Sequence, residues 1–81
     1  MELRIISPET QHTFTIVWLE AQTSHGSFII QAGHAPIILL LTHDKPIVFM
    51  LKNGKRQSMP IGRGILEVTR TVITIIMHEV Q

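Results

Sequence analysis

Apolar side chains recur at every second position along most of this chain, and a period of two is the spacing of a β-strand. The clearest runs are residues 14–19, 47–51 and 72–77. The first run alternates two sets of side chains: Phe14, Ile16 and Trp18 against Thr15, Val17 and Leu19. Such Ile-, Val-, Thr- and Phe-rich runs pack well on the pleated, half-buried surface of a sheet. Residues 34–43 are apolar without a clear period, and we interpret them as a further strand. The sequence therefore predicts an all-β fold.

Turn signals separate the runs. They are Ser7-Pro8-Glu9, Ser24-His25-Gly26, residues 42–46, Asn53-Gly54 and Arg70-Thr71. Asn53-Gly54 is the clearest, because both residues tolerate the positive φ that a type I′ hairpin turn requires. We expect it to join strands at residues 47–52 and 55–60, and the turn near Arg70 to join residues 65–69 to 72–78. Roughly seven or eight short strands at about 8–12-residue spacing predict a flattened antiparallel β-sandwich or barrel of two packed sheets.

Several of these strands are apolar on both faces. The run 72–77 has one polar side chain, Thr74, and the run 47–51 has none. The outer face of a sandwich normally meets water and is polar. Either these strands are central in a closed barrel whose outer faces are covered, or one outer face docks a partner. Because so small a domain has few elements left to cover a second face, the sequence favours a partner.

Length and composition exclude several classes of protein. The 81 residues are enough for one domain, residues 1–81. The chain has no cysteine, which excludes disulfides and cysteine-based zinc sites. Its net charge of +1 gives no strong field for nucleic acid or an anionic membrane. The N-terminus lacks a signal-peptide pattern, and the longest apolar run, residues 36–41, is far shorter than the ~20 residues of a membrane span. We therefore expect no direct membrane insertion.

No pattern of catalytic, metal-binding or cofactor-binding residues emerges. The five histidines match no zinc spacing, and the six acidic residues are scattered singly. There is no Gly-x-Ser-x-Gly elbow and no phosphate-binding loop. Lys52, Lys55 and Arg56 cluster at the predicted hairpin, but no aromatic residue lies beside them in sequence to form a stacking surface for nucleic acid. We expect these cations to keep the hairpin soluble and its edge unpaired. We expect no enzymatic, metal-binding, cofactor-binding or nucleic-acid-binding function.

Two motifs give the chain a family resemblance. Residues 26–36 have the form Gly-x-Phe-x-Ile-x-x-Gly-His-Ala-Pro, and residues 64–68 are Gly-Ile-Leu-Glu-Val. In the first motif we expect Gly33 to supply an unusual backbone angle and His34 to bond to nearby backbone. Together with residues 3–9 (Leu-Arg-Ile-Ile-Ser-Pro-Glu) and Phe14, their order and spacing resemble the N-terminal domain of the epsilon subunit of F-type ATP synthases, called delta in mitochondria. The resemblance runs from about Leu3 to Val80.

The resemblance implies a flattened β-sandwich at the foot of the central stalk, a rotor part without catalytic chemistry. It implies two partners, the gamma subunit on one side of the sandwich and the polar loops of the membrane c-ring at one end. Carried over by motif position, the c-ring contacts are Ser27, Gly33 and His34, and the gamma contact is Ile38. Such a subunit holds gamma to the ring, so that rotation driven by protons or sodium ions is transmitted without slip. The expected location is peripheral, at the cytoplasmic face of the bacterial inner membrane, as part of the synthase.

The chain departs from the family pattern at several positions. It ends at Gln81, just after the last predicted strand, so we expect the family's C-terminal helical hairpin, which regulates ATP hydrolysis, to be absent, either naturally or by truncation. Ser27 stands where an acidic residue is common, and Arg63 replaces the first glycine of a usual pair. These changes bear on the ring-facing contacts and not on the fold. A stand-alone β-sandwich or barrel binding module remains the alternative.

Overall fold

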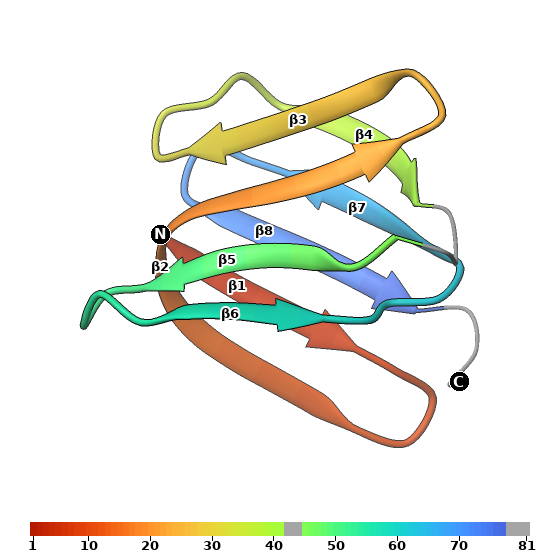
Figure 1. Cartoon of the computed structure of the whole chain (residues 1–81), viewed down its shortest axis with the longest axis horizontal. Helices are drawn as coiled ribbons and strands as arrows, with labels where there is room; N and C mark the ends of the chain where they lie inside the picture. Colours follow the sequence, from red (N-terminus) through yellow and green to blue (C-terminus); the bar gives the residue numbers. More distant parts are fainter. Residues whose placement is uncertain (42–44, 78–81) are drawn as a thin grey trace.

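The computed structural model describes residues 1–41 and 45–77, which form eight β-strands and no helix (Figure 1). The strands are β1 (Glu2–Ile6), β2 (Gln11–Thr23), β3 (Gly26–Gln31), β4 (Ile37–Leu41), β5 (Ile47–Leu51), β6 (Arg56–Met59), β7 (Gly64–Val68) and β8 (Val72–Met77). The predicted all-β fold is confirmed, and so is the strand in the apolar stretch after Gly33. The predicted break covers residues 42–46, of which 42–44 lie outside the described residues and 45–46 belong to no strand. The predicted extension of the last strand to His78 also lies outside the described residues.

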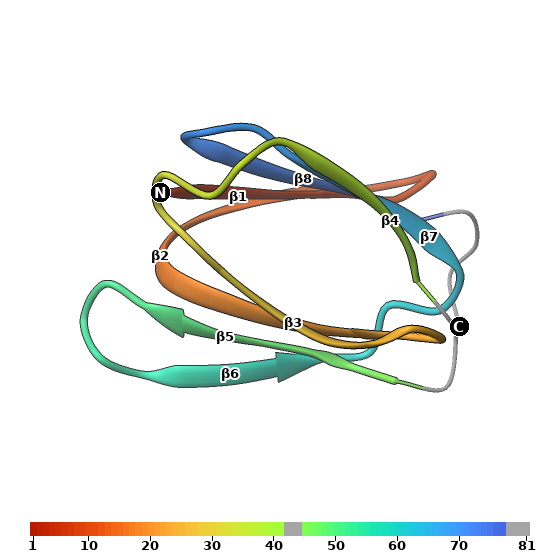
Figure 2. The same ribbon diagram turned by 90° about the horizontal axis from the view of Figure 1, so that it is seen from above.

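The strands form two layers that share one long strand, β2 (Figure 2). The first layer has the order β4-β7-β8-β1-β2. The second layer has β2 between β3 and β5, with β6 beside β5. Residues 11–15 of β2 pair with β1, whereas its later residues pair with β3 and β5. The chain is therefore a β-sandwich in which β2 crosses from one layer to the other.

A β-bulge marks the crossing. The pairing of β2 with β5 slips between Ile16 and Trp18, and the extra residue, Val17, is 47% exposed. A bulge bends its strand and increases the local twist, as a corner between two layers requires. Ile16 is buried before the bulge and Leu19 after it. The strict alternation predicted across residues 14–19 is therefore wrong beyond Ile16, and Trp18 lies outside the core.

The core between the layers is apolar throughout. In the described part of the chain it consists of Leu3, Ile5, Ile16, Leu19, Ala21, Ile30, Leu41, Ile47, Phe49, Ile61, Leu66, Val68, Ile73 and Ile75, with no buried polar or charged side chain. Phe49 is the largest of these side chains, and its ring centre lies 5.1 Å from that of Phe14. Since no buried polar group needs a partner, dense apolar packing alone stiffens the sandwich.

One strand pair departs from the predicted antiparallel arrangement. β1 and β8 are parallel, with Leu3 opposite Ile73 and Ile5 opposite Ile75. Turn signals specify direction only for strands that follow each other in the chain, whereas β1 and β8 are the first and last strands described. The other strand pairs are antiparallel, so the sheet is mixed.

The hairpin between β5 and β6 forms at the predicted position with a different turn. The Gly54 N–H donates to the Leu51 carbonyl (2.9 Å), and the Leu51 N–H donates to the Lys55 carbonyl (2.8 Å). Gly54 has a φ of 93°, but Asn53 has no positive φ, so the type I′ prediction is wrong. The bonding is that of a three-residue loop with a bulge at Gly54, which needs only one left-handed residue. The Asn53 carboxamide oxygen instead accepts the Lys55 N–H (3.0 Å).

Candidate functional site

An unbroken row of apolar side chains crosses the outer face of the first layer. Strand pairing places Leu40 of β4 opposite Ile65 of β7, Ile65 opposite Ile76 of β8, and Ile76 opposite Ile6 of β1. Leu40 is 72% exposed, Ile65 and Ile76 are also exposed, and Ile6 is half-buried. We call these four residues the outer row. With about 4.8 Å between neighbouring strands, it is roughly 14 Å long. A contiguous exposed apolar strip is typical of an interaction surface.

A mixed row of side chains flanks the outer row. Ile38 of β4 lies opposite Glu67, and Glu67 lies opposite Thr74, which in turn is paired with Arg4. Ile38 is 67% exposed, and Glu67 points to solvent. Arg4 also forms an ion pair with Glu2. The face therefore combines an apolar strip with a charged border, the usual composition of a protein interface.

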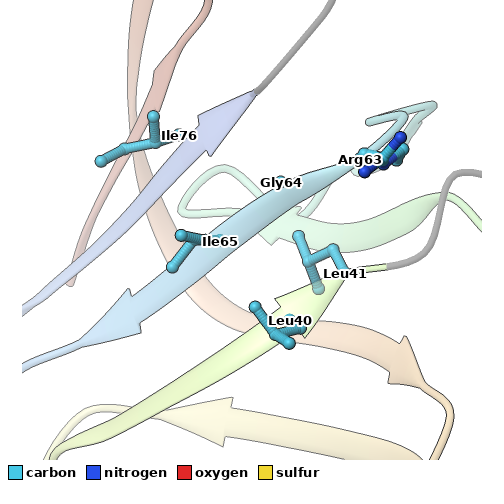
Figure 3. Close-up of a pocket in the computed structure, with 6 residues that line it drawn as sticks. All are labelled: Leu40, Leu41, Arg63, Gly64, Ile65 and Ile76. Atoms are coloured by element: carbon cyan, nitrogen blue, oxygen red, sulfur yellow. The ribbon is translucent and has the colours of Figure 1, made fainter.

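The outer row borders a hollow in the surface (Figure 3). Its volume is about 320 Å³, and it is lined by Leu40, Leu41, Arg63, Gly64, Ile65 and Ile76. These residues come from β4, β7 and β8, or directly precede β7, so the hollow has a floor without an opposing wall. Small-molecule pockets bury most of the ligand surface, which a one-sided hollow does not do. The geometry therefore fits the surface of another protein better than a metabolite.

The outer face of the second layer carries a smaller apolar patch around Trp18. Trp18 pairs with Met50 of β5, and Met50 pairs with Arg56 of β6. The Arg56 guanidinium carbon lies 5.2 Å from the Trp18 ring centre, so this side chain reaches past Met50 to cover the indole. A hollow of about 240 Å³ beside them is lined by Trp18, Glu20, Ile29, Gln31 and Arg56.

Comparison with known protein families identifies the family to which this β-sandwich belongs. The family described as "ATP synthase, Delta/Epsilon chain, beta-sandwich domain" matches residues 1–81. The chain belongs to this delta/epsilon family. The ATP synthase epsilon chains of Acinetobacter baumannii and Acinetobacter baylyi are each 31% identical to it over 77 residues. The matches cover 94% of this chain and 55% of each relative, so the chain spans about half the length of the curated relatives it matches. The resemblance inferred from the sequence motifs is confirmed.

Solved structures share the delta/epsilon fold. A chain of the Euglena gracilis mitochondrial ATP synthase superposes with a TM-score of 0.83 at 18% identity, over 95% of this chain and 49% of that one. A chain from the central stalk and c-ring structure of the Tetrahymena thermophila mitochondrial ATP synthase gives a TM-score of 0.76 at 19% identity, over 95% and 62%. At such low identity these likenesses establish the β-sandwich fold.

The delta/epsilon domain does not bring its three predicted c-ring residues together. Ser27 is the second residue of β3, at the end of the sandwich that carries the β2–β3 turn (Figure 1). Gly33 and His34 follow the other end of β3. Extended chain runs from Ser27 to the end of β3 at Gln31, a distance of roughly 13 Å, before the turn that contains Gly33. Ile38, the predicted gamma contact, lies on the outer face beside the outer row.

Ser27, Gly33 and His34 each form a hydrogen bond within the domain. The Ser27 hydroxyl donates to the Glu20 carboxylate (3.1 Å). His34 bonds through Nδ1 to the carbonyl of the following residue (2.7 Å), so the predicted backbone contact of His34 is confirmed. Gly33 has a φ of 84°, as predicted, and its N–H donates to the Arg70 carbonyl (3.2 Å). This bond ties the loop after β3 to the turn between β7 and β8.

Sequence reasoning missed the contact between Trp18 and the basic hairpin. Arg56 lies two strands away from Trp18 in the sheet, and only the pairing of β2, β5 and β6 brings them together. The chain offers no local pattern that reports this pairing. Neither a cluster of three His, Asp or Glu side chains suited to a metal ion nor a helix able to span a membrane occurs in residues 1–41 and 45–77.

Proposed function

We propose that this chain is a central-stalk rotor subunit of a proton- or sodium-translocating F-type ATP synthase, coupling the gamma subunit to the membrane c-ring. The outer row is the observation that best supports the proposal, because it is an exposed apolar strip across four strands of a stiff sheet. Membership of the delta/epsilon family supplies the class of complex. The role needs contact surfaces and rigidity and no side-chain chemistry, so the subunit itself is non-catalytic.

The gamma subunit covers the outer face of the first layer in this proposal. Ile38 and Leu40 are the most exposed apolar side chains there and supply the largest area to bury. The two longer dimensions of the domain are 27 and 26 Å. One broad face therefore approaches the roughly 800 Å² that each partner contributes to a standard interface.

The c-ring contact is proposed at one of the two ends of β3, either at Ser27 or at Gly33 and His34. Because Ser27 is at one end of the sandwich and Gly33 and His34 are at the other, a ring surface that meets one end leaves the other free. Cross-linking of Ser27→Cys and His34→Cys variants to the c-ring separates the two ends. We expect one of the two variants to cross-link efficiently, and no cross-link from either would contradict the contact. The subunit then lies peripherally at the cytoplasmic face of the bacterial inner membrane, as part of the synthase, in line with the bacterial relatives.

The first experiment is co-expression with the gamma subunit of the same organism, followed by native mass spectrometry. We expect a stable one-to-one complex. Leu40→Glu should weaken it, because a carboxylate would be buried in the interface, whereas Gln22→Glu on the other layer serves as the matched control. A folded monomer that does not bind gamma would mean that the chain shares the fold of the family but not the coupling role. It would favour a stand-alone binding module, the second candidate, for which the patch around Trp18 offers a surface.

A further inference from the structure

The positive charges of this chain are concentrated in one segment. Residues 45–66 carry five cations and no acid: Lys45, Lys52, Lys55, Arg56 and Arg63. Three of them, Lys52, Lys55 and Arg56, lie on the β5–β6 hairpin, and all three are exposed. Residues 45–66 are therefore a local basic region, although the net charge of the chain is only +1.

The basic hairpin is continuous with the apolar patch of the second layer. Arg56 covers the Trp18 ring at 5.2 Å, and Ile29, 59% exposed, lines the same hollow. We call Trp18, Ile29 and Arg56 the hairpin surface, and Lys52 and Lys55 lie beside it at the tip of the hairpin. Trp and Arg are the side chains most often found as energetic anchors of protein interfaces. The surface lies on the opposite layer from the outer row, so a partner on one leaves the other accessible.

We propose that the hairpin surface docks an acidic segment of another protein. The segment places a carboxylate against Arg56, further acidic residues toward the lysines of the hairpin tip, and an apolar side chain in the hollow beside Trp18 and Ile29. The Arg56 guanidinium, which lies over the Trp18 ring, can donate two N–H groups at once to a carboxylate. This binding function goes beyond the proposed coupling role and uses none of its surfaces.

Glu20 gives the hairpin surface a direction. Its carboxylate lines the same hollow and accepts the Ser27 hydroxyl at 3.1 Å. A second carboxylate beside Glu20 would be repelled, whereas one beside Arg56 would be attracted. The acidic end of the docked segment therefore lies over β6, and its apolar side chain lies toward β3.

The same features disfavour two other anionic partners. A nucleic-acid strand needs aromatic faces on which bases stack, and the Arg56 guanidinium occupies the face of Trp18. Basic segments that bind anionic lipids usually cluster about 4–8 cations, and only three of the five cations in residues 45–66 lie on the hairpin. An acidic polypeptide needs neither, and it uses the charge and the hollow together.

The test uses the full chain labelled with ¹⁵N and a synthetic peptide rich in Glu with a central Leu pair. Trp18 is the sole tryptophan, so its indole N–H reports the surface directly. We expect saturable shifts of that signal and of the hairpin amides, with an affinity that falls as salt is raised. Arg56→Gln should weaken binding at least about fivefold, and Arg56→Lys should retain more of it, because the charge remains. Arg63→Gln removes the same charge outside the hairpin and should change the affinity less than about twofold.

Several outcomes would overturn the inference. They are the absence of saturable shifts, shifts centred on the outer row, equal losses for Arg56→Gln and Arg63→Gln, and unchanged binding when Gln replaces Glu in the peptide. Tighter binding to oligothymidylate or to vesicles of anionic phospholipid than to the peptide would also reassign the surface. None of these results depends on gamma, so the coupling role is tested separately.

Discussion

Gly64 begins β7 where no side chain fits. A Cβ on this residue would lie 2.6 Å from the carbonyl oxygen of Ile76 in the neighbouring strand, and that backbone atom cannot rotate away. We expect Gly64→Ala to force β7 and β8 apart and to lower the free energy of unfolding by about 2 kcal/mol or more. Urea unfolding followed by circular dichroism measures the change.

Gly54 provides the contrast, because its constraint is conformational. Nothing lies within 4 Å of a Cβ at Gly54, but its φ is 93°. Gly54→Ala should cost about 1 kcal/mol, and Gly54→Asn less, since Asn tolerates left-handed backbone. At Gly64, Asn should be no better than Ala. Equal behaviour of Ala and Asn at Gly54, or a neutral Gly64→Ala, would contradict these assignments.

The side of the sheet on which a residue lies was predictable from sequence only where the strand is regular. Alternation puts Ile47 and Phe49 on one face of their strand and Ile73 and Ile75 on one face of theirs, and the structure buries all four in the core. It failed at Trp18, because the bulge after Ile16 shifts the phase by one position. A bulge is selected by the tertiary corner between two layers, and the local sequence carries no turn residue that announces it.

The bend in β2 between the two layers depends on one additional residue, Val17. Deleting Val17 would leave Ile16 and Leu19 in simple alternation but would remove the bend between the layers. We expect the deletion to cost at least about 3 kcal/mol, at the upper end of the range for single changes. Val17→Thr keeps the extra, β-branched residue and should stay within about 0.5 kcal/mol of the parent. Thermal and urea unfolding of the two variants test this, and an equally stable deletion would show that the corner needs no bulge.

The edge strand β4 carries no charged side chain, and two of its residues, Ile38 and Leu40, are exposed. In the described chain it pairs only with β7, and its sequence is Ile-Ile-Leu-Leu-Leu. Proteins usually protect such edges with lysine, proline or a bulge, because an open edge pairs with a second copy. We expect the isolated domain to self-associate reversibly as its concentration rises, and Leu40→Lys to suppress this. Gln22→Lys on the other layer is the control for added charge. Sedimentation velocity is the measurement, and a parent protein that stays monomeric at high concentration would contradict the expectation.

Sequence periodicity and turn signals predicted which elements exist, and the family motifs predicted the fold family. They could not predict how distant elements meet. The parallel pairing of β1 with β8 and the approach of Arg56 to Trp18 both depend on contacts between strands far apart in the chain. The candidate surfaces therefore became visible only when whole rows of side chains could be followed across the layers.

For the whole molecule, the pairing of β1 with β8 makes folding a long-range process. Residues 2–6 pair with residues 72–76, so almost the whole described chain lies between the partners. Topologies of this kind fold in milliseconds to seconds, and we expect a single exponential phase in stopped-flow refolding.

The order of events in that phase is also testable. Ile75→Val in the β1–β8 pair should mainly speed unfolding, because this pairing forms late. Ile47→Val at the locally formed β5–β6 hairpin should mainly slow refolding. Both residues are buried, and each change should cost about 1 kcal/mol, enough to read a φ-value. The opposite pattern would place the closure of the chain ends before the hairpin.

The pairing of the first strand with the last also has a consequence during protein synthesis. One edge of β1 pairs with a strand that is synthesised about 70 residues later. At typical bacterial and eukaryotic elongation rates this delay is roughly 4–14 s. Throughout that interval the apolar side chains of Leu3 and Ile5 lack their neighbours Ile73 and Ile75. The core of the nascent chain therefore stays incomplete until translation is nearly finished. We expect a holding chaperone to matter most during this period.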